Sequence, residues 1–82
     1  MLDLPAPIDA GWRDIIFNRA IDFHEDGAVE DALEIFRLLA FLAPGDGGVW
    51  RALARCHDDL GQHDAAERLR ELGQQVDEEN LT

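Results

Sequence analysis

The sequence predicts an all-α domain in which four antiparallel helices form two stacked helical hairpins. Three observations indicate this fold class. Apolar residues recur at spacings of three and four in four successive segments, which is the period of an amphipathic helix. No segment alternates polar and apolar residues with the period of two that a half-buried strand shows. Gly27 and Gly61 lie 34 residues apart, so the chain divides into two units of similar length.

The first helix is expected from Trp12 onward. Apolar residues follow helical steps as far as Phe23, and only Arg19 interrupts them. Residues 1–11 carry prolines at positions 5 and 7 and end in a glycine. Because the residue before a proline avoids the α region, we expect residues 1–11 to form an extended N-terminal arm.

The remaining three helices are separated by turn residues. The second has its apolar residues within 32–42 and stops at the proline and glycine that open the turn of residues 44–48. The third is expected over about residues 49–60, and the fourth over about 63–76 with a narrow apolar stripe and polar residues elsewhere. Residues 78–82 are polar and are expected to form a frayed tail.

The two units share a pattern of small and large residues. Each unit has an alanine between large residues on its first helix and an alanine early in its second helix. These alanines would let paired helices approach closely, and the larger residues would fill the space around them. A glycine relieves the backbone where each pair of helices reverses direction. A shift of 34 residues aligns Ile16 with Trp50, Ala20 with Ala54, Phe23 with His57 and Ala32 with Ala66.

This period and pattern resemble the tetratricopeptide repeat, over about residues 13–77. The resemblance implies a repeat domain at residues 12–77 with two helical hairpins in an α-α superhelix. Arg19 stands where that repeat usually has a leucine, and His57 replaces an aromatic residue. The alternative fold is a plain four-helix bundle whose spacing is accidental.

Composition excludes several classes of function. The chain has 18 acidic residues against seven arginines and no lysine, with a net charge of -11. Binding to nucleic acid or to an anionic membrane usually needs a basic surface, so neither partner is expected. Cys56 is the single cysteine and cannot form an internal disulfide. The N-terminus lacks the basic start and apolar core of a signal peptide, and we expect a soluble cytoplasmic protein.

The sequence offers little for catalysis. It has no glycine-rich phosphate loop and no nucleophile elbow. Cys56 and His57 are neighbours on one helix and therefore point in different directions. His57 and His63 flank the Gly61 turn, but a zinc site would need two more ligands. We expect no catalytic residue, no cofactor and no metal site, and hence no enzyme.

The second helix has more apolar surface than one packed face requires, because residues 35–43 are apolar nearly all round. Leu38, Phe41 and Leu42 extend beyond the stripe needed within the first hairpin. We predict that they form an interface with another polypeptide chain. Three alternatives remain for what covers them, namely the N-terminal arm, a second copy of the chain or a different protein.

On the resemblance to tetratricopeptide repeats, the first helix of each unit would line a groove that binds a partner. Phe17 and Ile21 would form an apolar strip in this groove. The guanidinium groups of Arg51 and Arg55 would lie beside the strip, so the groove would suit a peptide with apolar anchors and hydrogen-bond acceptors. An alternative is that Phe17 and Ile21 belong to the core. The predicted groove residues are Asp14, Phe17, Asn18, Ile21, Arg51 and Arg55, with His24 and Asp58 beside them.

Residues 30–44, 50–56 and 60–66 are also similar to the corresponding segments of bacterial type III secretion chaperones. That resemblance implies a cytosolic chaperone or co-chaperone with a role in bacterial virulence. Its partner would be an exported translocator or needle subunit, whose apolar segment it masks before secretion, or a small helical co-chaperone. Those chaperones usually have about three repeats, whereas this chain has room for two. The alternative function is a tetratricopeptide adaptor or self-associating scaffold unrelated to secretion.

Overall fold

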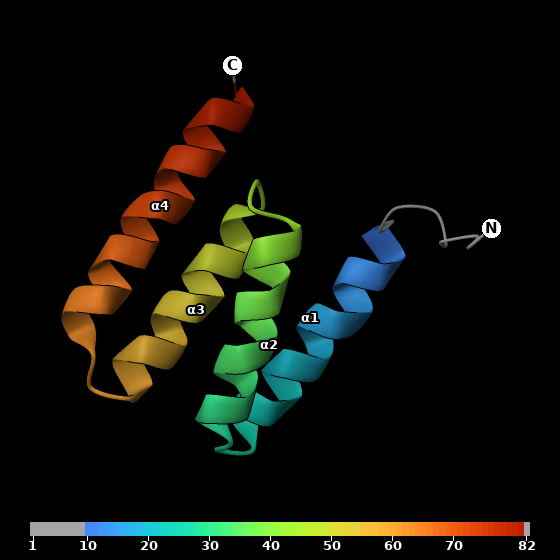
Figure 1. Ribbon diagram of the computed structural model, residues 1–82, viewed down its shortest axis with the longest axis vertical. Helices are drawn as coiled ribbons and strands as arrows, with labels where there is room; N and C mark the ends of the chain where they lie inside the picture. Colours follow the sequence, from blue (N-terminus) through green and yellow to red (C-terminus); the bar gives the residue numbers. More distant parts are fainter. Residues whose placement is uncertain (1–9, 82) are drawn as a thin grey trace.

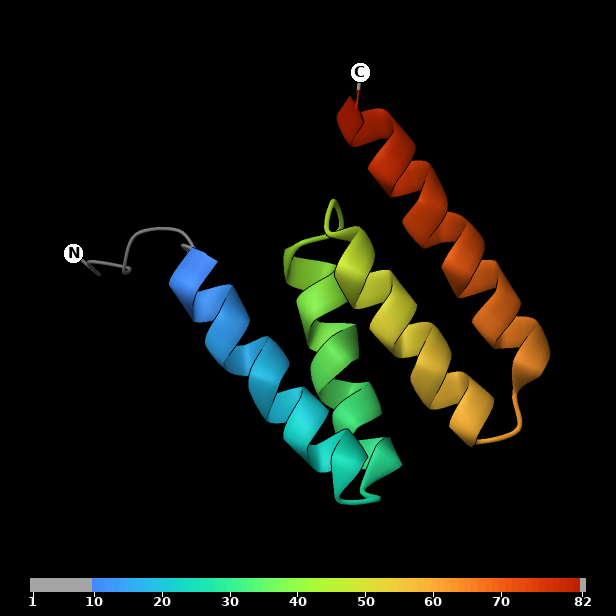
Figure 2. The same ribbon diagram turned by 180° about the vertical axis from the view of Figure 1, so that it is seen from behind.

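The computed structural model describes residues 10–81, which form four helices connected by short turns. They are α1 (Ala10–Glu25), α2 (Val29–Leu42), α3 (Gly47–Asp59) and α4 (His63–Leu81). Each helix packs against the one that follows it and runs in the opposite direction (Figure 1), and the view from behind shows the same order (Figure 2). Residues 10–81 contain no strand. The predicted all-α class is therefore confirmed.

The two hairpin turns share one geometry. Gly27 and Gly61 have positive φ angles of 85° and 77°, which a residue with a side chain rarely adopts. After α1, the Ala28 amide donates to the Phe23 carbonyl at 2.9 Å, and the turn after α3 repeats this bond between residues 62 and 57 at 2.8 Å. Both turns are Schellman motifs, in which the glycine lets the chain satisfy the last carbonyls of the helix. The glycines aligned by the sequence therefore occupy equivalent positions.

The core lies on both sides of α2. Phe36 is completely buried, and its ring meets the edge of the Phe17 ring from α1 at a centroid distance of 5.2 Å. Val49, Leu53 and Cys56 of α3 are buried in the same cluster. The alanines expected between the helices are all inaccessible to solvent, namely Ala20, Ala32, Ala54 and Ala66. Their lack of bulk is what allows the helix axes to approach closely.

Asp46 joins the starts of α1 and α3. Its carboxylate accepts a hydrogen bond from the Gly48 amide at 3.0 Å, which makes it the N-cap of α3. Arg13 of α1 donates to both oxygens of the same carboxylate, at 2.6 and 3.2 Å. The Trp50 indole also donates to the Pro44 carbonyl at 2.8 Å. Helix α3 thus begins at Gly47, inside the segment predicted as a turn.

Replacing Asp46 with alanine should lower the free energy of unfolding by about 1–2 kcal/mol. Loss of an N-cap costs about 0.5–2 kcal/mol, and loss of a partly exposed ion pair with Arg13 adds up to about 1 kcal/mol. Urea denaturation followed by circular dichroism measures the change. The control is Asp22→Ala, because this exposed carboxylate accepts no hydrogen bond within residues 10–81. Equal stability of the two variants would contradict the assigned N-cap.

Helix α4 continues to Leu81, so the prediction of a frayed tail from residue 78 is wrong for residues 78–81. Tertiary contacts explain the longer helix. The Asn80 side-chain amide donates to the Gly45 carbonyl at 3.0 Å, and Asp77 forms an ion pair with Arg51 of α3. The end of α4 is therefore held against the turn between α2 and α3, although its own residues are polar.

Two glycines bring α3 and α4 close together. Gly47 and Gly73 are both buried. A Cβ atom added at Gly73 would lie 3.2 Å from the Gly47 carbonyl oxygen and 3.3 Å from the Trp50 Cβ atom. The sequence pattern did not indicate this contact, because a glycine within a helix carries no periodic apolar signal.

The N-terminal boundary also differs from the prediction. Helix α1 begins at Ala10, so residues 10 and 11 are helical rather than part of an extended arm. The rest of the predicted arm, residues 1–9, lies outside the described residues, as does residue 82 of the predicted tail. None of the helices within residues 10–81 is long and apolar enough to cross a membrane.

Candidate protein-binding surfaces

The groove predicted from the first helix of each unit, here named the first-helix groove, is partly core on its α1 side. Phe17 and Ile21 are half-buried and pack against the hydrophobic cluster, whereas Asp14 and Asn18 are exposed. The Arg13 guanidinium lies over the Phe17 ring, 4.1 Å from its centroid, and covers one face of it. The apolar strip offered to a partner is therefore smaller than the sequence suggests.

The two arginines of this groove differ in their surroundings. Both Arg51 and Arg55 are exposed on α3. Arg51 forms an ion pair with Asp77 of α4, whereas Arg55 makes no hydrogen bond or ion pair within the described part of the chain. Arg55 is thus the cation of this set that is free to meet a partner. The role of the first-helix groove in binding stays a prediction.

Side chains link α1 to α3 and α3 to α4 beside this groove. At the far end of α1 from the Arg13–Asp46 pair, His24 Nε2 contacts Asp59 Oδ2. Asp58 faces α4 instead, where it meets His63 at 2.8 Å and Arg70 at 2.6 Å. The hydrogen bond with His63, followed by that from Arg70, holds the pKa of the Asp58 carboxyl below its usual value. Asp58 therefore remains charged at neutral pH and serves the α3–α4 contact.

The residues predicted as a second interface are exposed together on α2. We name Leu38, Phe41 and Leu42 the α2 apolar face. Leu38 is 52% exposed, Phe41 82% and Leu42 39%. The neighbouring residues Leu39 and Ala40 are buried, so the helix has one apolar side in the core and another in solvent. The sequence identified this surface because residues 35–43 are apolar on nearly every side of the helix.

A groove adjoins the α2 apolar face, and the sequence did not reveal it. It lies between α2 and α4, with α3 as its floor, and has a volume of about 490 Å³. Most of its lining is apolar. We name it the interhelix groove, and it is lined by Arg37, Ala40, Phe41, Pro44, Trp50, Leu53, His57 and Leu69. Trp50 is half-buried and Leu53 is buried, and the separation of α2 from α4 leaves both at the floor of this groove.

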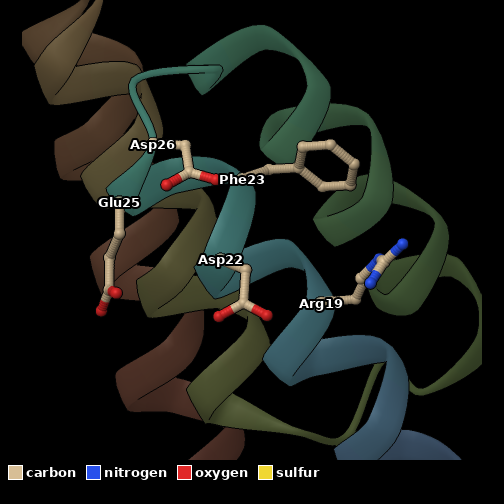
Figure 3. Close-up of a pocket in the computed structure, with 5 residues that line it drawn as sticks. All are labelled: Arg19, Asp22, Phe23, Glu25 and Asp26. Carbon is tan, nitrogen blue, oxygen red and sulfur yellow. The ribbon is translucent and has the colours of Figure 1, made fainter.

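A second hollow lies at the end of α1 and differs in its chemistry (Figure 3). Its volume is about 390 Å³, and it is lined mainly by charged side chains. The Arg19 guanidinium lies over the Phe23 ring at 5.9 Å from the centroid. In Figure 3 the carboxylates of Asp22, Glu25 and Asp26 are spread apart and do not converge on one shared point. We therefore interpret this hollow as a solvated surface of charged side chains.

The described residues offer neither a metal-binding cluster nor an activated cysteine. Within residues 10–81, no group of three or more histidine, cysteine, aspartate and glutamate side chains could hold a metal ion. Cys56 is buried, and burial raises the pKa of its thiol. A thiol with a raised pKa is a poor nucleophile at neutral pH.

Comparison with known proteins identifies one relationship. The family model described as tetratricopeptide repeat matches residues 23–79, from the end of α1 through nearly all of α4. A search of curated proteins gave no match, and a search of solved structures gave none. The matched segment includes both glycine turns and three of the four alanines that are buried between helices.

Proposed function

We propose that this chain, which belongs to the tetratricopeptide repeat family, is a chaperone that covers an apolar segment of another polypeptide. Repeats of this family are generally interaction modules rather than catalysts. Stacked repeats present extended surfaces, and proteins of this architecture use such surfaces for binding. The proposal therefore assigns this chain a protein as its ligand.

One observation carries the proposal, namely the exposure of the α2 apolar face. Soluble monomers rarely leave large apolar patches uncovered, and such patches commonly mark protein interfaces. Burial of Phe41 and Leu38 against a partner would contribute about 1.5–3 kcal/mol each before ordering costs. The net charge of -11 keeps the free protein soluble while this surface is uncovered.

The type III secretion setting rests on the sequence likeness of residues 30–44, 50–56 and 60–66 to that class of chaperone. In this setting the partner is a translocator or needle subunit, which the chaperone or co-chaperone keeps soluble before export. An apolar face on an acidic protein supports such a task. It covers the apolar segment of the subunit and gives the complex a strong negative charge.

Co-expression with translocator and needle subunits of a type III secretion system tests this proposal. We expect one subunit to be recovered in a soluble complex with the chain, and to precipitate without it. Leu38→Glu should abolish the recovery, because a charge would enter the α2 apolar face. The control is Leu81→Glu, which makes the same change at a more exposed leucine at the end of α4.

Three results would contradict the proposal. Recovery of no subunit would argue against the secretion setting. Equal recovery with both variants would show that the α2 apolar face is not the contact. A stable homo-oligomer of the chain alone, detected by light scattering and disrupted by Leu38→Glu, would instead support a self-associating scaffold.

A further inference from the structure

We infer that the interhelix groove receives a short segment of the partner that carries a bulky apolar anchor and one carboxylate opposite Arg37. This inference rests on the proposed function, since it names the chemistry of the segment that the chain covers. It places the anchor between α2 and α4 rather than in the first-helix groove.

The size and lining of the groove fit an apolar side chain. Its volume of about 490 Å³ is within the range of about 300–1,000 Å³ that is usual for ligand pockets. Trp50 and Leu53 form an apolar floor, and Leu69 of α4 forms one wall. Phe41 stands at the opposite wall with 82% of its surface exposed. An anchor in the groove would bury both the floor and the Phe41 ring.

The apolar lining is specific to this groove and is not a general property of the repeat. A shift of 34 residues aligns Leu53 with Arg19 and His57 with Phe23. The hollow at Arg19 and Phe23 is the one lined by three carboxylates (Figure 3). Two aligned positions therefore line a charged hollow in the first unit and an apolar groove in the second, and only the second suits an apolar anchor.

Charge indicates the second feature of the segment. Three arginines, Arg13, Arg51 and Arg70, each form an ion pair with an aspartate. Arg37 lines the interhelix groove, is exposed and makes no hydrogen bond or ion pair within residues 10–81. A guanidinium group beside an apolar surface binds a carboxylate through two parallel hydrogen bonds. A carboxylate next to the anchor would complement this cation.

The net charge of the chain limits which other residues the partner segment can carry. A chain with a charge of -11 repels an acidic partner at long range, so the segment should carry no other acidic residue. The same repulsion disfavours a second copy of this chain as the occupant. The partner segment is thus apolar, with a single carboxylate and neutral or basic flanks.

A display library of random 12-residue peptides, selected on the intact protein, provides the probe. We expect the selected peptides to share an aromatic residue or leucine near one aspartate or glutamate. Their affinity is then measured by fluorescence anisotropy. Arg37→Glu and Phe41→Glu should each weaken binding by about tenfold or more. The first variant loses a hydrogen-bonded ion pair with the peptide, and the second loses buried apolar contact.

Two controls separate the groove from general effects of charge. Arg68→Glu makes the same change at an exposed arginine of α4 that does not line the groove. The affinity of this variant for the peptides should stay within about twofold of that of the parent protein, because salt partly screens a charge on the surface. A selected peptide in which lysine replaces the acidic residue should bind the Arg37→Glu variant more tightly than it binds the parent protein. Circular dichroism should show unchanged helix content, since Arg37 and Phe41 are exposed.

The outcomes distinguish this inference from the proposed function. If peptides bind the parent but only Arg55→Glu weakens them, the segment occupies the first-helix groove and the inference is wrong, while the proposed function stands. Selected peptides without a carboxylate would also overturn it, as would unchanged affinity in Arg37→Glu. If no peptide binds and no subunit is recovered by co-expression, both the inference and the proposed function fail.

Discussion

Replacement of Phe36 with alanine is expected to lower the free energy of unfolding by about 3–5 kcal/mol, the usual cost of removing a buried phenylalanine side chain. Phe36 is completely buried at the centre of α2, where its ring contacts Phe17 of α1. A cavity at this position would weaken both the α1–α2 contact and the hydrophobic cluster shared with α3. Because a small domain has a free energy of unfolding of only about 5–15 kcal/mol, this loss is a large fraction of the total.

Urea denaturation followed by circular dichroism measures this loss. The matched control is Phe41→Ala, because it makes the same change five residues later on the same helix, where the ring is 82% exposed. The control should change stability by no more than about 0.5 kcal/mol. A similar loss in both variants would mean that Phe41 is covered in the free protein.

Gly73→Leu is expected to lower the free energy of unfolding by about 1–3 kcal/mol through overpacking. The aligned residue of the first unit is Leu39, which is buried, so the repeat pattern alone would predict a tolerated change. At Gly73, however, a Cβ atom would already lie 3.2 Å from the Gly47 carbonyl oxygen. A leucine would push α4 away from α3, and this cost should exceed the gain of about 1 kcal/mol from replacing a helical glycine.

Thermal and urea denaturation test the Gly73 prediction, with Gln74→Leu as the control at the next, exposed position. Hydrogen exchange should also become faster near Asn80, whose bond to the Gly45 carbonyl requires α4 to stay in place. Increased stability of Gly73→Leu would show that the two helices can separate without cost, and that the repeat pattern outweighs the close contact.

The candidate surfaces differ in how well the sequence predicted them. The α2 apolar face was predictable because it follows from the composition of one helix. The interhelix groove was not, because its walls come from α2 and α4 and its depth depends on the distance between them. The first-helix groove was predicted by resemblance, yet the sequence left open whether Phe17 and Ile21 belong to it or to the core, and in the structure they pack against the hydrophobic cluster.

The sequence by itself determined the helical hairpins, the buried alanines and both glycine turns. These features depend on local properties, namely the helical period of apolar residues and the left-handed backbone that Gly27 and Gly61 can adopt. Only the tertiary structure decided that Arg13 pairs with Asp46, that α4 extends to Leu81 and that Arg37, beside an apolar groove, forms no ion pair within residues 10–81. Such contacts join residues far apart in the chain. They are set by the distances between packed helices. The residue pattern along one helix does not encode which charged side chain of a neighbouring helix its residues will contact.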